Sequence, residues 1–199
     1  MKLHDFGPSG NCYKVRLLLA QLGKAYERVN VDLLKGEGKT PEFKRQFPLG
    51  RVPVLERDDG TQLAESNAIL WYLAEGTHFL PPSREARAEA LQWLFWEQYS
   101  HEPYVAVVYA WICEFGVPAG KEGELKERRG KGIAALEVME RQLAKRPWFT
   151  GDHYGVADIA LYAYTHVSPR ADFDLAPFPG VLDFLDRVKA QPGHIEIEA

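Results

Sequence analysis

The stretch PSGNCYKVRLLLAQLG at residues 8–23 decides the fold of the first part of this chain. Before it, residues 2–6 (KLHDF) are a short segment with a roughly alternating pattern, which is typical of a strand. The apolar residues after the turn have the i, i+3, i+4, i+7 spacing of an amphipathic helix: Val15, Leu18, Leu19 and Leu22. Gly23 is suited to end that helix. The sequence therefore predicts a strand, a tight turn and a helix.

The turn brings Ser9, Asn11 and Cys12 to the start of the helix, where unpaired N–H groups and the helix dipole favour negative charge. A thiol with a pKa of about 8.5 is only about 3 % ionised at pH 7, and lowering its pKa by two units requires about 2.7 kcal/mol. A hydrogen bond to a charged acceptor (about 1.5–3 kcal/mol) plus the helix end (about 0.3–1 kcal/mol) can supply this. The site suits a thiolate, of Cys12 or of a ligand. The alternative is that Ser9 and Asn11 only cap the helix.

Composition and charge bound the class of protein. The 199 residues are 46 % hydrophobic and 26 % charged, which is typical of a globular protein with one large or two small domains. The net charge of −4 argues against nucleic acid or an anionic membrane as a partner. Cys12 and Cys113 are far apart and indicate neither a zinc site nor a disulfide framework. We therefore expect no metal site. The sequence has no long apolar run and no signal segment, so we expect a cytoplasmic protein.

Strand and helix patterns alternate up to residue 76. Residues 26–32 alternate like a second strand, and the short connection from the first strand predicts parallel pairing. Residues 36–40 (GEGKT) end like a phosphate-binding loop, but Leu33 stands where its first glycine is required, so we expect no nucleotide site. Two further strands, joined by a hairpin turn at Asp58-Asp59-Gly60, lead to a helix that begins near Ser66.

Strand signals vanish beyond residue 76. The sequence predicts a first domain at 1–76, a proline-marked linker at 77–83 and an all-helical domain at 84–199. The first helix of that domain should run from 84 to 111 with a kink at Pro103. The other expected helices are residues 121–144, an apolar helix starting near Tyr154 with Asp158 as an acid in its first turn, and residues 178–189.

This order of elements resembles the glutathione transferase superfamily, in particular its cytosolic bacterial serine-type, theta-like or nu-like members. Three motifs carry the resemblance: PLGRVPVL at 48–55, ESNAILWYL at 65–73, and Gly151 followed by Ala157-Asp158-Ile159. The resemblance covers essentially the whole chain. It implies an α/β, thioredoxin-like N-terminal domain followed by an all-α C-terminal domain, and homodimers. One departure is Gly155, which stands where a Ser or Thr usually caps a helix.

The resemblance also implies a binding site for glutathione, which would be a co-substrate. In the family the proline after Val is cis, so Val52 and Pro53 would meet the backbone of the tripeptide. Glu65 and Ser66 would hold its γ-glutamyl end, with the carboxylate at a helix start. Lys39 or Arg51 is the candidate for the glycyl carboxylate.

For catalysis, Ser9 matches the hydroxyl that donates a hydrogen bond to the glutathione sulfur in serine-type members. Asn11 and Lys14 resemble the Ser/Thr-x-Asn pattern of bacterial members that reduce disulfides with glutathione. Cys12 falls near the cysteine of bacterial members that form a mixed disulfide. We rank them Ser9, Asn11, Cys12. The first hypothesis is a glutathione transferase acting in detoxification. The second is a glutathione-dependent disulfide reductase or peroxidase, and the third a binding or scaffold module of the same fold.

Family position also implies a pocket for a small hydrophobic electrophile. Its expected walls are Phe6, Tyr104, Trp111 and Phe115. The alternative for each of these aromatic residues is ordinary packing within the protein core.

Overall fold

A four-stranded sheet with the order β2-β1-β3-β4 forms the centre of the first unit in the computed structural model, which describes residues 1–199. The strands are β1 (Lys2–Asp5), β2 (Glu27–Asn30), β3 (Val54–Glu56) and β4 (Gln62–Ala64). β1 pairs in parallel with β2, with Leu3 opposite Arg28, and antiparallel with β3, with Leu3 opposite Leu55. β4 pairs antiparallel with β3. The predicted parallel crossover and the predicted hairpin are therefore confirmed.

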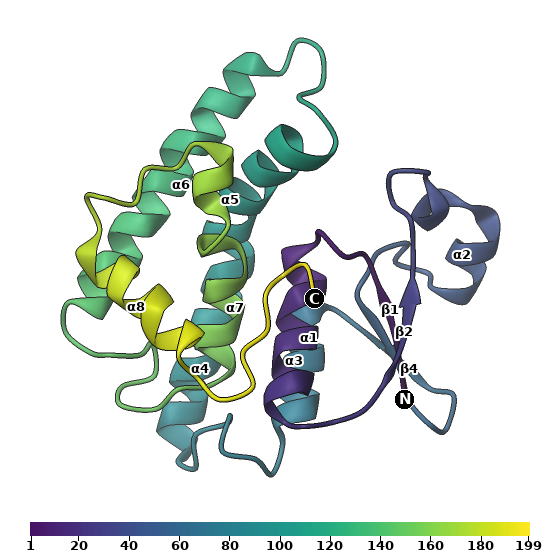
Figure 1. The fold of residues 1–199 in the computed structure, drawn as a ribbon, viewed down its shortest axis with the longest axis horizontal. Coiled ribbons are helices and arrows are strands. Elements are labelled where there is room, and N and C mark those ends of the chain that lie inside the picture. Colours follow the sequence, from purple (N-terminus) through teal and green to yellow (C-terminus); the bar gives the residue numbers. More distant parts are fainter. The chain divides into compact units, whose positions relative to one another are not determined.

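Three α-helices and a short 3-10 turn complete this unit. They are α1 (Gly10–Gln21), the turn η1 (Glu37–Lys39), α2 (Pro41–Gln46) and α3 (Ser66–Ala74). Figure 1 shows α1 and α3 together on one face of the sheet and α2 beyond the other. Burial of α1 extends past its apolar stripe, because Lys14 and Arg16 are also almost completely buried. The thioredoxin-like fold expected for the N-terminal part is thus present.

The second unit, Gly76–Gln191, consists of helices. These are α4 (Arg84–Trp96), the π-helical turn η2 (Glu97–His101), α5 (Glu102–Tyr109), the π-helical turn η3 (Ala110–Glu114), α6 (Glu122–Leu143), α7 (Val156–Thr165), the 3-10 turn η4 (Ser168–Ala171) and α8 (Pro179–Lys189). No helix in the structure is both long enough and apolar enough to cross a membrane.

The helix expected at 84–111 is interrupted close to the predicted kink. Pro103 has no N–H to donate to the carbonyl of Tyr99, and its ring crowds that carbonyl. The chain widens into the π-helical turn Glu97–His101 just before the proline and resumes as α5. Such wide turns are a known way for a helix to absorb a break in its hydrogen-bond pattern.

The end of the chain differs from the sequence prediction, which puts all of 84–199 in the helical domain. Pro192–Ala199 instead belongs to the first unit, together with Met1–Glu75. Figure 1 shows this segment, in yellow, beside α1. Tyr13 Oη donates to the carbonyl of Ile195 at 2.7 Å, and Ile197 is buried. The segment has no regular secondary structure, so no periodicity in the sequence could reveal where it packs.

The first turn of α7 is held by Asp158, as predicted. Its Oδ2 accepts the N–H of Gly155 and its Oδ1 the N–H of Phe149, both at 2.9 Å. Gly155 itself has no room for a side chain, because a Cβ atom there would lie 2.5 Å from the carbonyl oxygen of Phe79. This close backbone contact explains why a glycine, and not the usual Ser or Thr, stands at position 155.

This contact predicts that Gly155→Ser destabilises the protein although it supplies a better capping side chain. We expect a loss of about 1–3 kcal/mol in the free energy of unfolding, because the new Cβ must displace backbone. Urea unfolding measures it. Gly123→Ala in α6, where a Cβ meets nothing within 4 Å, is the control and should be neutral or stabilising. A Gly155→Ser protein as stable as the parent would contradict the prediction.

Candidate active site

The N-termini of α1 and α3 meet in the first unit. Ser66 Oγ, at the first residue of α3, donates to Asn11 Oδ1, in the first turn of α1, at 3.0 Å. Each helix end carries partial positive charge and backbone N–H groups that point outward. Two such ends side by side are suited to bind an anion. The structure brings Asn11 and Ser66 together at this position.

A buried lysine joins the two helix ends. Lys14 Nζ lies 3.4 Å from Ser66 Oγ and 3.4 Å from Asn67 Oδ1, and the residue is fully buried. A buried ammonium group behind both helix ends adds to their attraction for negative charge. The resemblance pairs Lys14 with Asn11, but the sequence analysis does not include Lys14 among the predicted site residues. Its i+3 spacing from Asn11 puts both on one helix face, but this spacing alone does not indicate that α3 covers the lysine.

Ser9 is the N-cap of α1, where its Oγ accepts the N–H of Cys12 at 3.4 Å. A hydroxyl group has two acceptor lone pairs and one hydrogen. Capping uses a lone pair, so the hydrogen can still be donated to an anion in front of the helix. Capping and anion stabilisation, which the sequence presents as alternatives, are compatible in this geometry.

Cys12 points the other way, into the protein. Its side chain is completely buried, and its Sγ accepts the N–H of Phe6 at 3.4 Å. Burial, with the nearby charge of Asp5, raises the pKa of the Cys12 thiol to about 12. Cys12 is therefore a thiol, not a thiolate, at neutral pH, and it has the character of a structural cysteine.

Other predicted site residues lie on the loops of the same unit. The Val52–Pro53 bond is cis, as expected from the resemblance. Glu65, directly before α3, has a φ of +69°, a backbone conformation that favours glycine and costs a glutamate about 1–3 kcal/mol. Strain of this kind clusters at functional sites.

Lys39 and Arg51 are exposed on two loops that touch each other. Gly38, next to Lys39, and Gly50, next to Arg51, are so close that a Cβ on Gly38 would lie 3.6 Å from the carbonyl oxygen of Gly50. The two candidate cations therefore belong to one loop cluster.

The residues predicted to hold an electrophile are divided between the two units. Phe6 is buried in the first unit. In the second, the Tyr104 ring lies 5.4 Å from Lys131 Nζ, and the Trp111 ring 5.6 Å from the guanidinium of Arg128. Phe115 is about half exposed. Tyr104 and Trp111 thus share a polar environment on α6, which is richer in charge than a plain helix-helix core.

Glu114 is a titratable residue of the second unit that the sequence analysis missed. It ends the π-helical turn next to Phe115, and burial raises the pKa of its carboxyl group to about 7. Its Oε1 is buried without a hydrogen-bond partner. A single glutamate at the end of a helix gives no sequence signal for such a shift, which arises from packing.

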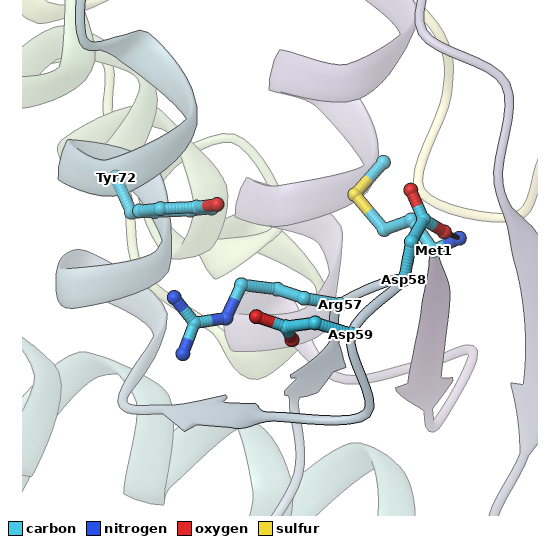
Figure 2. A pocket seen from close by; sticks show the side chains of 5 residues that line it. All are labelled: Met1, Arg57, Asp58, Asp59 and Tyr72. Atoms are coloured by element: carbon cyan, nitrogen blue, oxygen red, sulfur yellow. Dashed lines mark hydrogen bonds and ion pairs between the residues drawn. The ribbon is translucent and has the colours of Figure 1, made fainter.

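A cavity in the first unit is distinct from the predicted site. It has a volume of about 320 Å³ and lies between the β3–β4 hairpin and α3; Met1, Arg57, Asp58, Asp59 and Tyr72 line it (Figure 2). The Arg57 guanidinium lies 5.4 Å from the centre of the Tyr72 ring. A smaller cavity of about 140 Å³ borders Phe47 and Val54. No group of three or more His, Cys, Asp or Glu side chains is arranged to hold a metal ion.

A thioredoxin-like domain with paired helix ends, followed by an all-helical domain, defines the class of protein. Residues 1–75 match the model of the glutathione S-transferase N-terminal domain, and residues 90–192 match that of the C-terminal domain. The chain belongs to the glutathione S-transferase family.

Relatives in this family have different names. The chain is 31 % identical to the disulfide-bond oxidoreductase YfcG of Escherichia coli (strain K12), over 94 % of this chain and 89 % of the relative. It is 35 % identical to maleylacetoacetate isomerase of Rhizobium meliloti (strain 1021), over 93 % and 89 %. The crystal structure of a glutathione S-transferase from Pseudomonas fluorescens [Pf-5] is 46 % identical with a TM-score of 0.95, covering 100 % of this chain and 98 % of that one.

The environments of the two cysteines predict which one reacts. In the native protein at pH 8, iodoacetamide should label the exposed Cys113 and spare Cys12, which is buried and has the higher pKa. Mass spectrometry of tryptic peptides measures this. Both should be labelled after denaturation, and native Cys113→Ser should take no label. Labelling of native Cys12 at the rate of a free thiol would contradict the account.

Proposed function

We propose that this protein is a glutathione transferase that ionises the thiol of glutathione at the start of α1 and delivers it to a small hydrophobic electrophile. The observation that carries the proposal is the meeting of two helix N-termini through Ser66 and Asn11, with the Ser9 hydroxyl at the same end of α1. A tripeptide with carboxylates and a thiol fits a site that favours negative charge at more than one point.

We assign the parts of glutathione as follows. The γ-glutamyl carboxylate is held at the start of α3 by Ser66, with the charge of Lys14 behind it, and Glu65 faces the γ-glutamyl ammonium group. Val52 and the cis Pro53 bind the cysteinyl backbone. Lys39 or Arg51 pairs with the glycyl carboxylate. The family match and the strained backbone of Glu65 support this arrangement.

In the proposed reaction the thiol proton leaves to solvent, and Ser9 donates its hydroxyl hydrogen to the thiolate that remains. The sulfur then attacks the electrophile, a carbon–sulfur bond forms, and the leaving group departs with its electron pair. Tyr104, Trp111 and Phe115, all in the second unit, are the side chains proposed to receive the electrophile. Cys12, buried and protonated, takes no part in this reaction.

A second function, glutathione-dependent reduction of disulfides or peroxides, is favoured by one observation. Asn11, at the same helix end, carries a side-chain amide that can donate to sulfur, and its oxygen is oriented by Ser66. In this reaction the glutathione thiolate would attack a disulfide sulfur and release the other sulfur as a thiolate.

The role of Ser9 as a hydrogen-bond donor to the sulfur predicts the effect of Ser9→Ala. Loss of a hydrogen bond to a charged sulfur, worth about 1.5–3 kcal/mol, should raise the pKa of bound glutathione's thiol by about 1–2 units. Conjugation of an aromatic halide at neutral pH should fall accordingly. Ultraviolet titration of the thiolate in the complex measures the pKa.

Ser83→Ala is a matched control, because Ser83 caps α4 in the same way, with its Oγ accepting the N–H of Ala86 at 3.1 Å. Ser83→Ala should lower the free energy of unfolding by about 1 kcal/mol and leave the pKa of the glutathione thiol unchanged. If Ser9→Ala leaves conjugation intact while Asn11→Ala abolishes disulfide reduction, the second function is correct. If the unaltered protein does not bind immobilised glutathione, both enzymatic functions are wrong and the third hypothesis, a binding or scaffold module of this fold, is favoured.

We also propose that the protein is a homodimer and that it acts in the cytoplasm. α4 and the turn after it expose Leu91, Phe95 and Tyr99, which are four residues apart and therefore lie on one face. Phe95 is 71 % and Tyr99 83 % exposed, and large apolar side chains that cluster on a surface mark interaction sites. A second copy of the chain is the partner that the family implies.

Charge on this face should therefore separate the subunits. We expect the double variant Phe95→Asp, Tyr99→Asp to be a folded monomer and the parent a dimer, as measured by light scattering after size-exclusion chromatography. Ile133→Asp, at a residue of α6 that is 41 % exposed, should leave the dimer intact. A parent protein that is monomeric at micromolar concentration would contradict the proposal.

A further inference from the structure

Arg16 connects the turn before α1 to the end of the chain. Its guanidinium is completely buried, and Nη1 donates to both carboxylate oxygens of Asp5 at 2.7 and 2.9 Å. Nη2 donates to two backbone carbonyls, that of Gly7 at 2.9 Å and that of Ile197 at 2.5 Å. One nitrogen atom thus holds the turn and the segment Pro192–Ala199 at the same time.

The segment Pro192–Ala199 follows α1 back toward that turn. Gly193 packs so closely on the helix that a Cβ there would lie 2.9 Å from the Cα of Gln21. Farther on, Ile195 accepts a hydrogen bond from the buried Tyr13, and Ile197 is 2 % exposed. The contacts progress from the last turn of α1 to its first turns, and the ribbon beside α1 in Figure 1 follows this course.

The turn itself is short, so its parts move together. The N–H of Ser9 donates to the carbonyl of Phe6 at 2.9 Å, which closes the turn around Gly7. Gly7 lies against a second arginine, because a Cβ on it would be 3.3 Å from Arg28 Nη2. Arg28 Nε in turn donates to Asp5 at 2.6 Å. The backbone that carries Ser9 therefore contacts a group formed by the buried Asp5 and Arg16 together with Arg28, and the Ile197 carbonyl accepts a hydrogen bond from this group.

We propose that the segment Pro192–Ala199 is a positioning element of the active site, which acts through Arg16 and Gly7 to fix the direction of the Ser9 hydroxyl. Without Ile197, a buried N–H of Arg16 loses its acceptor, and an unsatisfied buried donor is costly. The guanidinium then shifts to recover a partner and takes the Gly7 carbonyl with it. A displacement of about 1 Å at a catalytic group can cost about 100-fold in rate.

This inference rests on the proposed role of Ser9 and adds a specific expectation to it. The start of α3, which is proposed to hold the γ-glutamyl end of glutathione, makes none of these contacts. Loss of the segment should therefore weaken activation of the thiol while largely sparing the affinity for glutathione.

Two variants test the proposal: deletion of residues 195–199, and Tyr13→Phe, which removes one hydroxyl group and keeps its packing. The deletion should raise the pKa of the thiol of bound glutathione by about one unit, which lowers the thiolate fraction about tenfold at a pH well below that pKa, with less than about a threefold change in the dissociation constant. Tyr13→Phe should also raise the pKa of the glutathione thiol, by a smaller amount. Tyr162→Phe, at a buried tyrosine of α7, is the control and should change neither the pKa of the glutathione thiol nor the dissociation constant.

Hydrogen exchange of the peptide that contains Ser9 separates this proposal from the proposed function. Faster exchange in the deletion variant or in Tyr13→Phe supports the positioning role even if the unaltered protein proves not to bind glutathione. Unchanged exchange together with an unchanged thiol pKa in folded Tyr13→Phe and in the folded deletion variant would overturn it. If the deletion variant does not fold, Tyr13→Phe alone decides.

Discussion

Two helices begin at the same place in the first unit, and the rest of the site depends on that constraint. A helix N-terminus attracts negative charge only weakly by itself, by about 0.3–1 kcal/mol. Here the ends of α1 and α3 are joined by the contact between Ser66 and Asn11, and the buried Lys14 lies behind both. The attraction of the separate groups then acts on one ligand. A weak general property of helices is thereby concentrated at one place, which suits the proposed binding of a small molecule with several negative charges.

The sheet makes this convergence possible. α1 follows β1 and α3 follows β4, and both helices pack on the same face of the sheet. Beneath the turn into α1, Asp5 and Arg16 form an ion pair with no exposed side-chain surface. A buried charge pair is costly to break, since removal of one partner leaves the other charge uncompensated. Loss of either partner would therefore disturb the turn, and Ile197 near the end of the chain accepts a hydrogen bond from the same arginine.

The sequence predicted the order of strands and helices because each element has its own periodicity or its own turn chemistry. It also predicted Ser9, Asn11 and Ser66 near helix starts, because capping residues are local signals. Three features were out of reach. Cys12 could not be known to face the core, since position in a first turn does not fix the side chain's surroundings. Lys14 looks like a surface lysine until α3 covers it, and Pro192–Ala199 has no pattern that indicates its packing. All three depend on contacts between residues distant in the chain, whereas the elements themselves do not.

A crystal structure of the protein with bound glutathione tests the central claim most directly. The account predicts the γ-glutamyl carboxylate at the first turn of α3 and the sulfur atom within hydrogen-bond distance of Ser9 Oγ, about 3.5 Å or less. A tripeptide that lies elsewhere, or whose sulfur points away from the start of α1, would contradict it.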